Sequence, residues 1–94
     1  MPRGLAKESF SYVARVLLYL YDREAQGVPP SLSEIISETG VPRAVFYNHL
    51  KDNLAREGYV VYEKTQERII IARLTEKGRR LAECLAGCRD VLPL

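Results

Sequence analysis

The sequence predicts a single α+β domain in which a three-helix core is followed by a β-hairpin and an additional C-terminal helix. Its 94 residues suit one domain and leave no room for two. Apolar residues recur at helical spacing up to about residue 57, and two runs rich in β-branched and aromatic residues follow within residues 59–74. We therefore expect one unit over residues 1–94, ordered helix, helix, turn, helix, hairpin, helix.

The first helix is predicted over residues 7–25. Apolar residues at helical spacing form one wide face, which consists of Phe10, Val13, Ala14, Leu17, Leu20 and Tyr21. Val16, Tyr12 and Tyr19 add apolar surface on its flanks. We expect the helix to stop at Gly27, because the two prolines that follow it lack the backbone N–H that a helix needs.

A second, short helix is predicted over residues 32–39. Ser31 and Glu34 form a capping box, in which the serine hydroxyl and the glutamate carboxylate each accept from a backbone N–H of the other residue. Ser31 and Ser33 are therefore interpreted as caps rather than as an anion site. Gly40 suits the left-handed conformation that ends a helix, and Pro42 suits the first turn of the next one.

The third helix is predicted over residues 42–57, and Gly58 ends it. The sequence leaves open which of two neighbouring residues joins its buried stripe, which consists of Val45 or Phe46, Leu50 and Leu54. In either case the opposite side of the helix is exposed, and it carries Arg43, Ala44, Tyr47, Asn48 and Lys51.

The hairpin is predicted over residues 59–74, with strands at 59–64 and 68–74 and a polar tip between them. A short strand around Val28 is expected to pair with its edge. The last helix is predicted over residues 75–88, with Thr75 as its N-terminal cap. Apolar residues and both cysteines share one face of this helix, namely Leu81, Cys84, Leu85 and Cys88.

This order of elements resembles the winged helix-turn-helix family of DNA-binding proteins. Four segments carry the resemblance in the correct order and spacing. Residues 32–43 are similar to the family's first helix and turn, 45–50 to its recognition helix, 56–60 to the exit into the wing and 74–78 to the start of the closing helix. The nearest type is the small archaeal and MarR- or PadR-like transcriptional regulators, which are commonly dimers. One departure is the four-residue step from Leu50 to Leu54, which implies a rotated or extended end of the recognition helix.

The resemblance implies contacts to double-stranded DNA by the third helix, which would lie in the major groove. Arg43 is expected to make a bidentate contact to guanine and Asn48 to adenine, while Ala44 would touch a thymine methyl group. Tyr47 and Lys51 suit phosphates. The alternative is that these residues form only a solvated helix face.

The hairpin corresponds to the family's wing, which implies contacts to the DNA backbone or the minor groove. Lys64 and Arg68 supply positive charge there, whereas Glu63 and Glu67 dilute it, and a solvated tip is the alternative. The charge balance is −1 over residues 1–40 and +3 over residues 41–94, so we expect a polyanion to meet the second half of the chain.

A homodimer is expected from the first and last helices. Tyrosines exceed what a core needs, and dimer interfaces are enriched in aromatic residues. The predicted interface consists of Tyr12, Tyr19, Leu81, Cys84, Leu85 and Cys88. For the two cysteines three interpretations stay open: core or dimer-seam residues, disulfides across a two-fold axis, or a four-thiolate metal site.

The sequence argues against an enzyme, a cofactor-dependent protein and a membrane protein. His49 is the single histidine, and no motif for a nucleophile, a metal pair or a phosphate cradle is present. We therefore expect no catalytic residue, no metal and no cofactor. The longest apolar run covers residues 16–21, far short of the ~20 residues that span a bilayer, and no signal-peptide core is present, so a cytoplasmic location is expected. Ten arginines against four lysines and four Asn plus Gln favour a thermophilic source, and an archaeal source is what the resemblance to the small archaeal regulators implies.

The sequence thus predicts a sequence-specific, DNA-binding transcriptional regulator that acts as a homodimer. Its small size argues against a large pocket for an effector molecule, and a small effector stays open. The alternative is a winged-helix module that binds protein within a larger, transcription-related assembly. The mild net charge of +2 and the acidic residues near the wing keep this alternative open.

Overall fold

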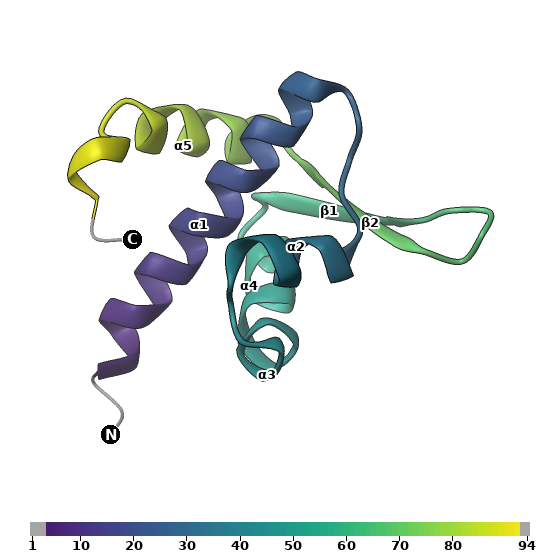
Figure 1. Cartoon of the computed structure of the whole chain (residues 1–94), viewed down its shortest axis with the longest axis horizontal. Helices are drawn as coiled ribbons and strands as arrows, with labels where there is room; N and C mark the ends of the chain where they lie inside the picture. The colour runs from purple at the N-terminus through teal and green to yellow at the C-terminus, as the bar shows by residue number, and fades with distance from the viewer. Residues whose placement is uncertain (1–3, 93–94) are drawn as a thin grey trace.

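The computed structural model describes residues 4–92, and their side chains from Phe10 onward. The helices are α1 (Gly4–Gln26), α2 (Leu32–Thr39), α3 (Arg43–Val45), a π-helical turn (Phe46–Leu50), α4 (Lys51–Arg56), α5 (Glu76–Ala86) and a 3₁₀ turn (Arg89–Val91). The strands β1 (Val60–Lys64) and β2 (Ile70–Leu74) form an antiparallel hairpin that projects away from the helices (Figure 1). The predicted α+β class, with its three-helix core, hairpin and closing helix, is confirmed.

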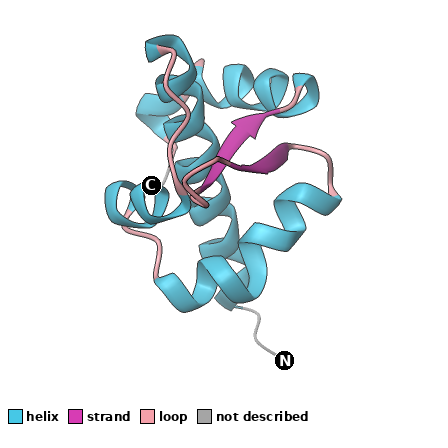
Figure 2. Ribbon diagram, turned by 90° about the vertical axis from the view of Figure 1, so that its right-hand side faces the viewer, coloured by secondary structure: helices cyan, strands magenta, loops and turns pink. Residues whose placement is uncertain are grey.

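Helix α1 is the centre of the fold, because α2, α5 and β2 all pack against it (Figure 2). The predicted face is buried at Ala14, Leu17 and Leu20. Val16 and Leu18 are buried as well, since elements cover α1 on more than one side. At the other end of the predicted apolar face, Phe10 is 47% exposed and lies outside the core.

Helix α2 has the predicted caps at both ends. The Glu34 N–H donates to Ser31 Oγ at 3.2 Å, and the Ser31 N–H donates to Glu34 Oε1 at 2.9 Å. At the other end Gly40 adopts a left-handed conformation with φ 75° and donates its N–H to the carbonyl of Ile36. These caps fix the angle at which the chain enters and leaves α2.

Residues 43–56 form one continuous helical segment with a wide turn in its middle. Phe46, Leu50 and Leu54 are its buried residues, whereas Val45 is only half-buried. The Lys51 N–H donates to the Phe46 carbonyl, five residues back, which defines the π-helical turn. The segment ends at Arg56, and Gly58 follows with φ 82°.

The hairpin pairs Val60 with Leu74 and Lys64 with Ile70. Arg68 was expected in the second strand, but it lies in the loop with φ 67°, and β2 begins only at Ile70. The edge strand expected around Val28 is instead a single bridge between Ser31 and Ile71.

The shift of the edge pairing along the chain has a simple cause. Pro29 and Pro30 have no N–H to donate to a neighbouring strand. Pro30 therefore takes part only through its carbonyl, which accepts from the Ala72 N–H at 3.0 Å.

Helix α5 begins as predicted and ends earlier. Thr75 caps it by accepting from the Gly78 N–H at 3.0 Å, and a Cβ at Gly78 would collide with the Tyr59 carbonyl. The buried residues of α5 are Gly78, Ala82 and Leu85. Of the residues predicted to share one face of this helix, Leu85 is buried, Leu81 and Cys88 are half-buried and Cys84 is exposed, because the small residues of α5 pack inward. No helix within residues 4–92 combines the length and apolarity needed to cross a bilayer.

Candidate nucleic-acid interface

The exposed side of residues 43–51 lies opposite the buried stripe of the same helical segment, which anchors it to the core. Arg43, Ala44, Tyr47 and Asn48 are exposed as predicted, whereas Lys51, predicted on the same exposed side, is half-buried. The Tyr47 ring meets the buried Phe46 ring edge-on, with centroids 5.6 Å apart. The Arg43 guanidinium lies 5.7 Å from the centroid of the Tyr47 ring, a cation–π distance. Tyr47 therefore lies between the core and Arg43, and it holds that arginine at the start of the helix.

Lys51 ties the same helix to the hairpin. Its ammonium lies 5.2 Å from the centroid of the Tyr62 ring, and the Tyr62 hydroxyl donates to the Lys51 carbonyl at 2.8 Å. Burial, reinforced by the negative charge of Asp52, raises the pKa of Tyr62 well above its usual value, so the phenol stays a donor. This role of Tyr62 was not predicted from the sequence, although its place between Val60 and Lys64 on one face of β1 indicates an inward side chain.

The hairpin tip is an ordered loop that fixes the position of Arg68. The Arg68 N–H donates to the Thr65 carbonyl at 2.9 Å, and the Thr65 N–H donates to the Ile69 carbonyl at 2.8 Å. The Thr65 hydroxyl also accepts from the Ile69 N–H at 3.1 Å. Lys64 is exposed directly opposite Ile70 in the register, and the two side chains therefore lie on the same face of the hairpin.

A shallow groove joins the helix to the wing. It is lined by the start of α2, one residue of the helix and the wing tip, namely Ser31, Leu32, Ser33, Tyr47, Arg68, Ile69 and Ile70. The structure thus brings Tyr47 and Arg68, predicted separately on helix and hairpin, to one concave surface. We call this surface the groove face, and it comprises the groove together with Arg43, Ala44, Asn48, Lys51 and Lys64.

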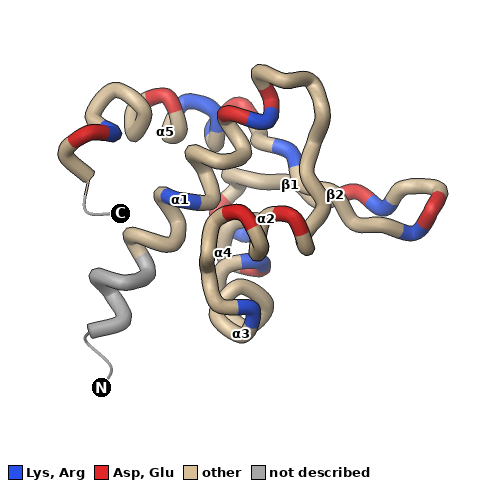
Figure 3. Tube along the Cα trace, viewed as in Figure 1, with Lys and Arg blue, Asp and Glu red and all other residues tan. Residues whose placement is uncertain are grey.

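The basic residues of the groove face lack acidic partners. Within the described residues, no carboxylate forms an ion pair with Arg43, Lys51, Lys64 or Arg68. Glu63, expected to dilute the charge of the wing, instead pairs with Arg73 at 2.9 Å, on the opposite side of the hairpin. Basic and acidic positions still alternate along the projecting tip (Figure 3).

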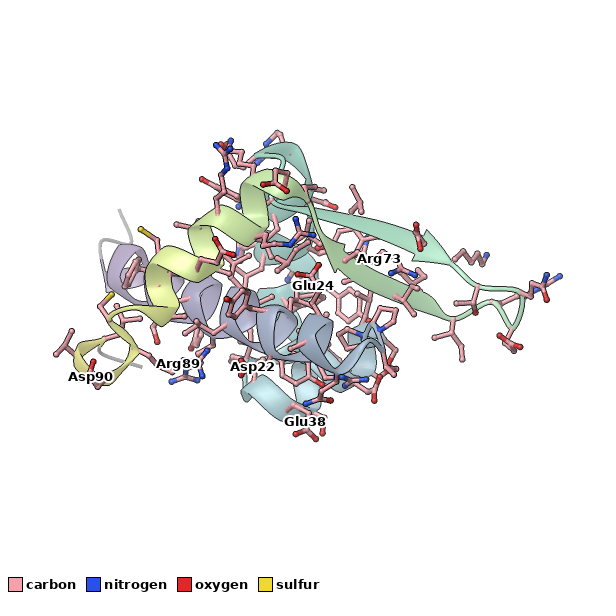
Figure 4. The ribbon with its side chains drawn as sticks, turned by 90° about the horizontal axis from the view of Figure 1, so that it is seen from above. Asp22, Glu24, Glu38, Arg73, Arg89 and Asp90 are labelled. Carbon is pink, nitrogen blue, oxygen red and sulfur yellow. The ribbon has the colours of Figure 1, made fainter. Side chains whose placement is uncertain are left out.

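Two arginines elsewhere form ion pairs that link segments to α1. Arg79 of α5 meets Glu24 of α1 through two bonds of 2.8 Å. Arg89 of the 3₁₀ turn reaches Asp22 of α1 at 3.3 Å (Figure 4). These contacts lie where α1 and α5 pack together, away from the groove face.

The residues predicted for a dimer interface differ in their exposure. Tyr12 and Tyr19 are half-buried, and the Tyr19 hydroxyl accepts from Arg23 at 2.7 Å. Leu81 is half-buried, whereas Leu85 lies in the core of the single chain. Leu85 therefore has little surface left for a partner.

Cys84 is exposed and Cys88 is half-buried, and both are free thiols. The Cys88 thiol lies 3.7 Å from the carbonyl oxygen of Cys84, as a weak donor. Within the part of the chain that is described, no three His, Cys, Asp or Glu side chains gather in a way that would hold a metal ion. His49 is exposed on the wide turn.

A second hollow lies behind the hairpin, between the end of α1, the following loop, β2 and α5. Its volume is about 230 Å³, with an apolar floor that includes Leu20, Pro30 and Ala72 and with Glu24 and Arg79 at its rim. Pockets for drug-sized ligands usually exceed about 300 Å³, and this one leaves room only for a small molecule.

Comparison with known proteins gives one family and several structures of the same fold. The model of the ArnR1-like winged-helix domain matches residues 4–92. No curated protein is significantly similar to the chain in sequence. The chain is similar to MepR, a transcription regulator of the Staphylococcus aureus multidrug efflux pump MepA, with 23% identity and a TM-score of 0.72 over 84% of this chain and 56% of MepR.

Two further structures share the fold. AF1382 from Archaeoglobus fulgidus has a TM-score of 0.73 and 22% identity over 87% of this chain and 88% of that one. The MarR family transcriptional regulator SPO1453 from Silicibacter pomeroyi has a TM-score of 0.68 and 22% identity over 85% of this chain. The present chain spans only 54% of SPO1453, little more than half the length of the regulator.

Proposed function

The chain belongs to the ArnR1-like winged-helix domain family, and from that premise we propose that it is a sequence-specific regulator that binds double-stranded DNA as a homodimer. The observation that carries the proposal is the groove face, where Arg43, Lys51, Lys64 and Arg68 have no carboxylate partner within the described residues. Phosphates release counterions when such cations neutralise them, and this release drives the binding of DNA.

The helical segment 43–56 enters the major groove in this proposal. Arg43, held by Tyr47 at the start of the segment, contacts guanine, and Asn48 contacts adenine. Ala44 lies against a thymine methyl group, while Tyr47 and Lys51 contact phosphates. Tyr62 supports this arrangement by holding the backbone of Lys51.

The wing lies on the DNA backbone or in the minor groove. Arg68 stands at the ordered tip and Lys64 lies on the groove-facing side of β1. Between the wing and the start of α2, the groove lined by Ser31 and Ser33 runs beside the DNA strand. The paired Arg73 and Glu63 face away from it.

The homodimer is supported by apolar surface far from the wing. Phe10 of α1 is 47% exposed and Val91 of the C-terminal 3₁₀ turn is 75% exposed, and Leu81 and Leu92 are half-buried. A two-fold partner would cover these side chains. It would also place two copies of the helix in successive major grooves, about 34 Å apart.

The proposal is tested by titrating labelled duplex DNA of mixed sequence at two salt concentrations and following the anisotropy. The test variant combines Arg43→Ala, Lys51→Ala and Arg68→Ala. Its matched control combines Arg73→Ala, Arg80→Ala and Arg89→Ala, which removes the same charge from ion-paired arginines. We expect the test variant to lose at least tenfold in affinity and to flatten the salt dependence by up to roughly 0.9 per lost phosphate contact.

The control variant should bind nearly as wild type does, because its arginines lie away from the groove face. Equal losses in both variants would show a response to net charge alone. Wild-type protein that fails to bind at low salt would make a protein-binding module the leading account. Sedimentation of the complex checks the dimer, which requires two chains on each duplex.

A further inference from the structure

The wide turn at Phe46–Leu50 interrupts an otherwise regular helix in the middle of the groove face. Its defining bond runs from the Lys51 N–H to the Phe46 carbonyl. Tyr47, Asn48 and His49, the three residues between the buried Phe46 and Leu50, are all exposed. A regular helix usually turns one of three such residues toward its buried side. π-Turns of this kind occur frequently at functional sites.

The turn has an identifiable cause in the core. Phe46, Leu50 and Leu54 are buried at successive four-residue steps. In a regular α-helix with 3.6 residues per turn, eight residues carry the direction of the side chain roughly 80° beyond two full turns. A wide turn takes up the extra residue and keeps all three side chains on the core.

Both ends of the segment are fixed, so the turn alone sets how they are rotated relative to each other. At the start, the Phe46 N–H donates to the Pro42 carbonyl at 3.0 Å. At the end, Tyr62 holds the carbonyl of Lys51, and the Tyr59 N–H donates to the Leu54 carbonyl at 2.9 Å.

This rotation decides whether the two expected base contacts share a groove. Arg43 and Asn48 are five residues apart, which places them roughly 140° apart around a regular α-helix. The wide turn begins between them and reduces that angle. Asn48 thereby moves toward the side on which Arg43 and Tyr47 lie.

We propose that the π-helical turn is the specificity-determining device of this helix, because it brings Arg43 and Asn48 to one face and so sets which neighbouring base pairs are read. The inference rests on the proposed function and adds to it the geometry of base reading. His49 is the residue that lengthens the step between the buried side chains, and it acts through the backbone rather than through its imidazole.

The test compares deletion of His49 with His49→Ala. Deletion leaves the buried side chains three and four residues apart, the spacing of a regular amphipathic helix, so the fold should persist in circular dichroism and thermal melting. The alanine variant keeps the length of the turn and is the matched control. Both are measured against a duplex selected by the wild-type chain and a scrambled duplex of the same composition.

We expect the deletion to keep its salt-dependent affinity for the scrambled duplex within about threefold and to lose at least tenfold in preference for the selected one, as the loss of a bidentate base contact implies. His49→Ala should keep that preference within about threefold. An unchanged preference after deletion would overturn the proposal, and so would an equal loss in both variants.

A second measurement needs no variant and tests whether the π-helical turn persists on DNA, even if the deletion does not fold. In the wild-type complex with the selected duplex, an NMR coupling across the hydrogen bond from the Lys51 amide to the Phe46 carbonyl supports the proposal. A bond from Lys51 to the Tyr47 carbonyl instead, as in a regular helix, contradicts it. Wild-type protein that binds DNA without preferring any duplex overturns the proposed function, which is a separate and earlier failure.

Discussion

The groove face and the packed pair α1 and α5 use arginine in opposite ways. Between α1 and α5, Arg79 meets Glu24 through two bonds and Arg89 meets Asp22. On the groove face, Arg43 and Arg68 have no such partner among the described residues. The first use orients helices, and the second leaves positive charge available to a polyanion. The position of carboxylates therefore distinguishes the two surfaces better than the modest net charge of +2.

The paired arginines contribute little stability individually. Arg79 and Glu24 have 35% and 40% of their side-chain surface exposed, and exposed pairs are usually worth no more than about 1 kcal/mol. The hydrophobic core supplies most of the stability that keeps both surfaces in place, and the buried stripe of residues 43–56 belongs to that core. The helix that carries the proposed DNA contacts therefore also contributes to the core.

The most severe loss of stability is expected from the helix that carries the groove face. Phe46 is fully buried, and Phe46→Ala should lower the free energy of unfolding by about 3–5 kcal/mol, through lost burial and the cavity left behind. Urea unfolding followed by circular dichroism measures it. The neighbouring Tyr47→Ala is the control, since Tyr47 is 39% exposed and should affect DNA affinity far more than stability. A loss below 1 kcal/mol at Phe46 would contradict the role of this residue as the anchor of the helix.

A smaller effect is expected on the side of α1 and α5. Hydrogen bonds from Arg79, opposed in part by burial, lower the pKa of the Glu24 carboxyl below its usual value. A lowered pKa in the folded state gives stability that is present above the unfolded value of about 4.3 and is lost as the pH falls through the folded pKa. Glu24→Gln should therefore lower the free energy of unfolding by at most about 1 kcal/mol at pH 7. It should also weaken the dependence of stability on pH below the unfolded pKa.

Unfolding of Glu24→Gln between pH 3 and 7 checks this prediction, with the exposed Glu38→Gln as control. Some pH dependence should remain, because the Ser31 N–H also lowers the pKa of Glu34. Binding to DNA should not change, since Glu24 lies away from the groove face. A Glu24→Gln variant that unfolds with the same pH dependence as wild type would show that the pair with Arg79 does not persist in solution.

Local features of the fold were predictable from the sequence, because neighbouring residues determine them. The caps at Ser31, Gly40 and Thr75 depend only on residues within one helical turn, and all are confirmed. On the third helix, exposure was predicted correctly for Arg43, Ala44, Tyr47 and Asn48, whereas Lys51 is half-buried. The roles of those exposed residues toward DNA remain predictions.

Features that depend on distant contacts were not predictable in the same way. The sequence showed the four-residue step from Leu50 to Leu54, but the wide turn that absorbs it follows from a core that also requires Phe46. On α5, Gly78 and Ala82 pack inward because other elements approach closely there. The sequence shows that these residues are small, but it does not show that other elements lie against them. The start of β2 was misplaced because isoleucines on either side of it have equal strand propensity.

Only a slight change in stability is expected from substitution of a single residue of the wing. Arg68 holds φ 67°, a left-handed conformation that costs a residue with a Cβ roughly 1–2 kcal/mol. Arg68→Gly should relieve this strain, and the greater freedom of glycine in the unfolded chain offsets part of the gain. The melting temperature should therefore rise slightly, while the affinity for DNA falls severalfold through the loss of a cation. Arg68→Asn, which tolerates the same backbone conformation, separates charge from conformation and should lose affinity equally. If either variant kept its full affinity, the charge of Arg68 would have no function in binding, and the wing would be a solvated tip.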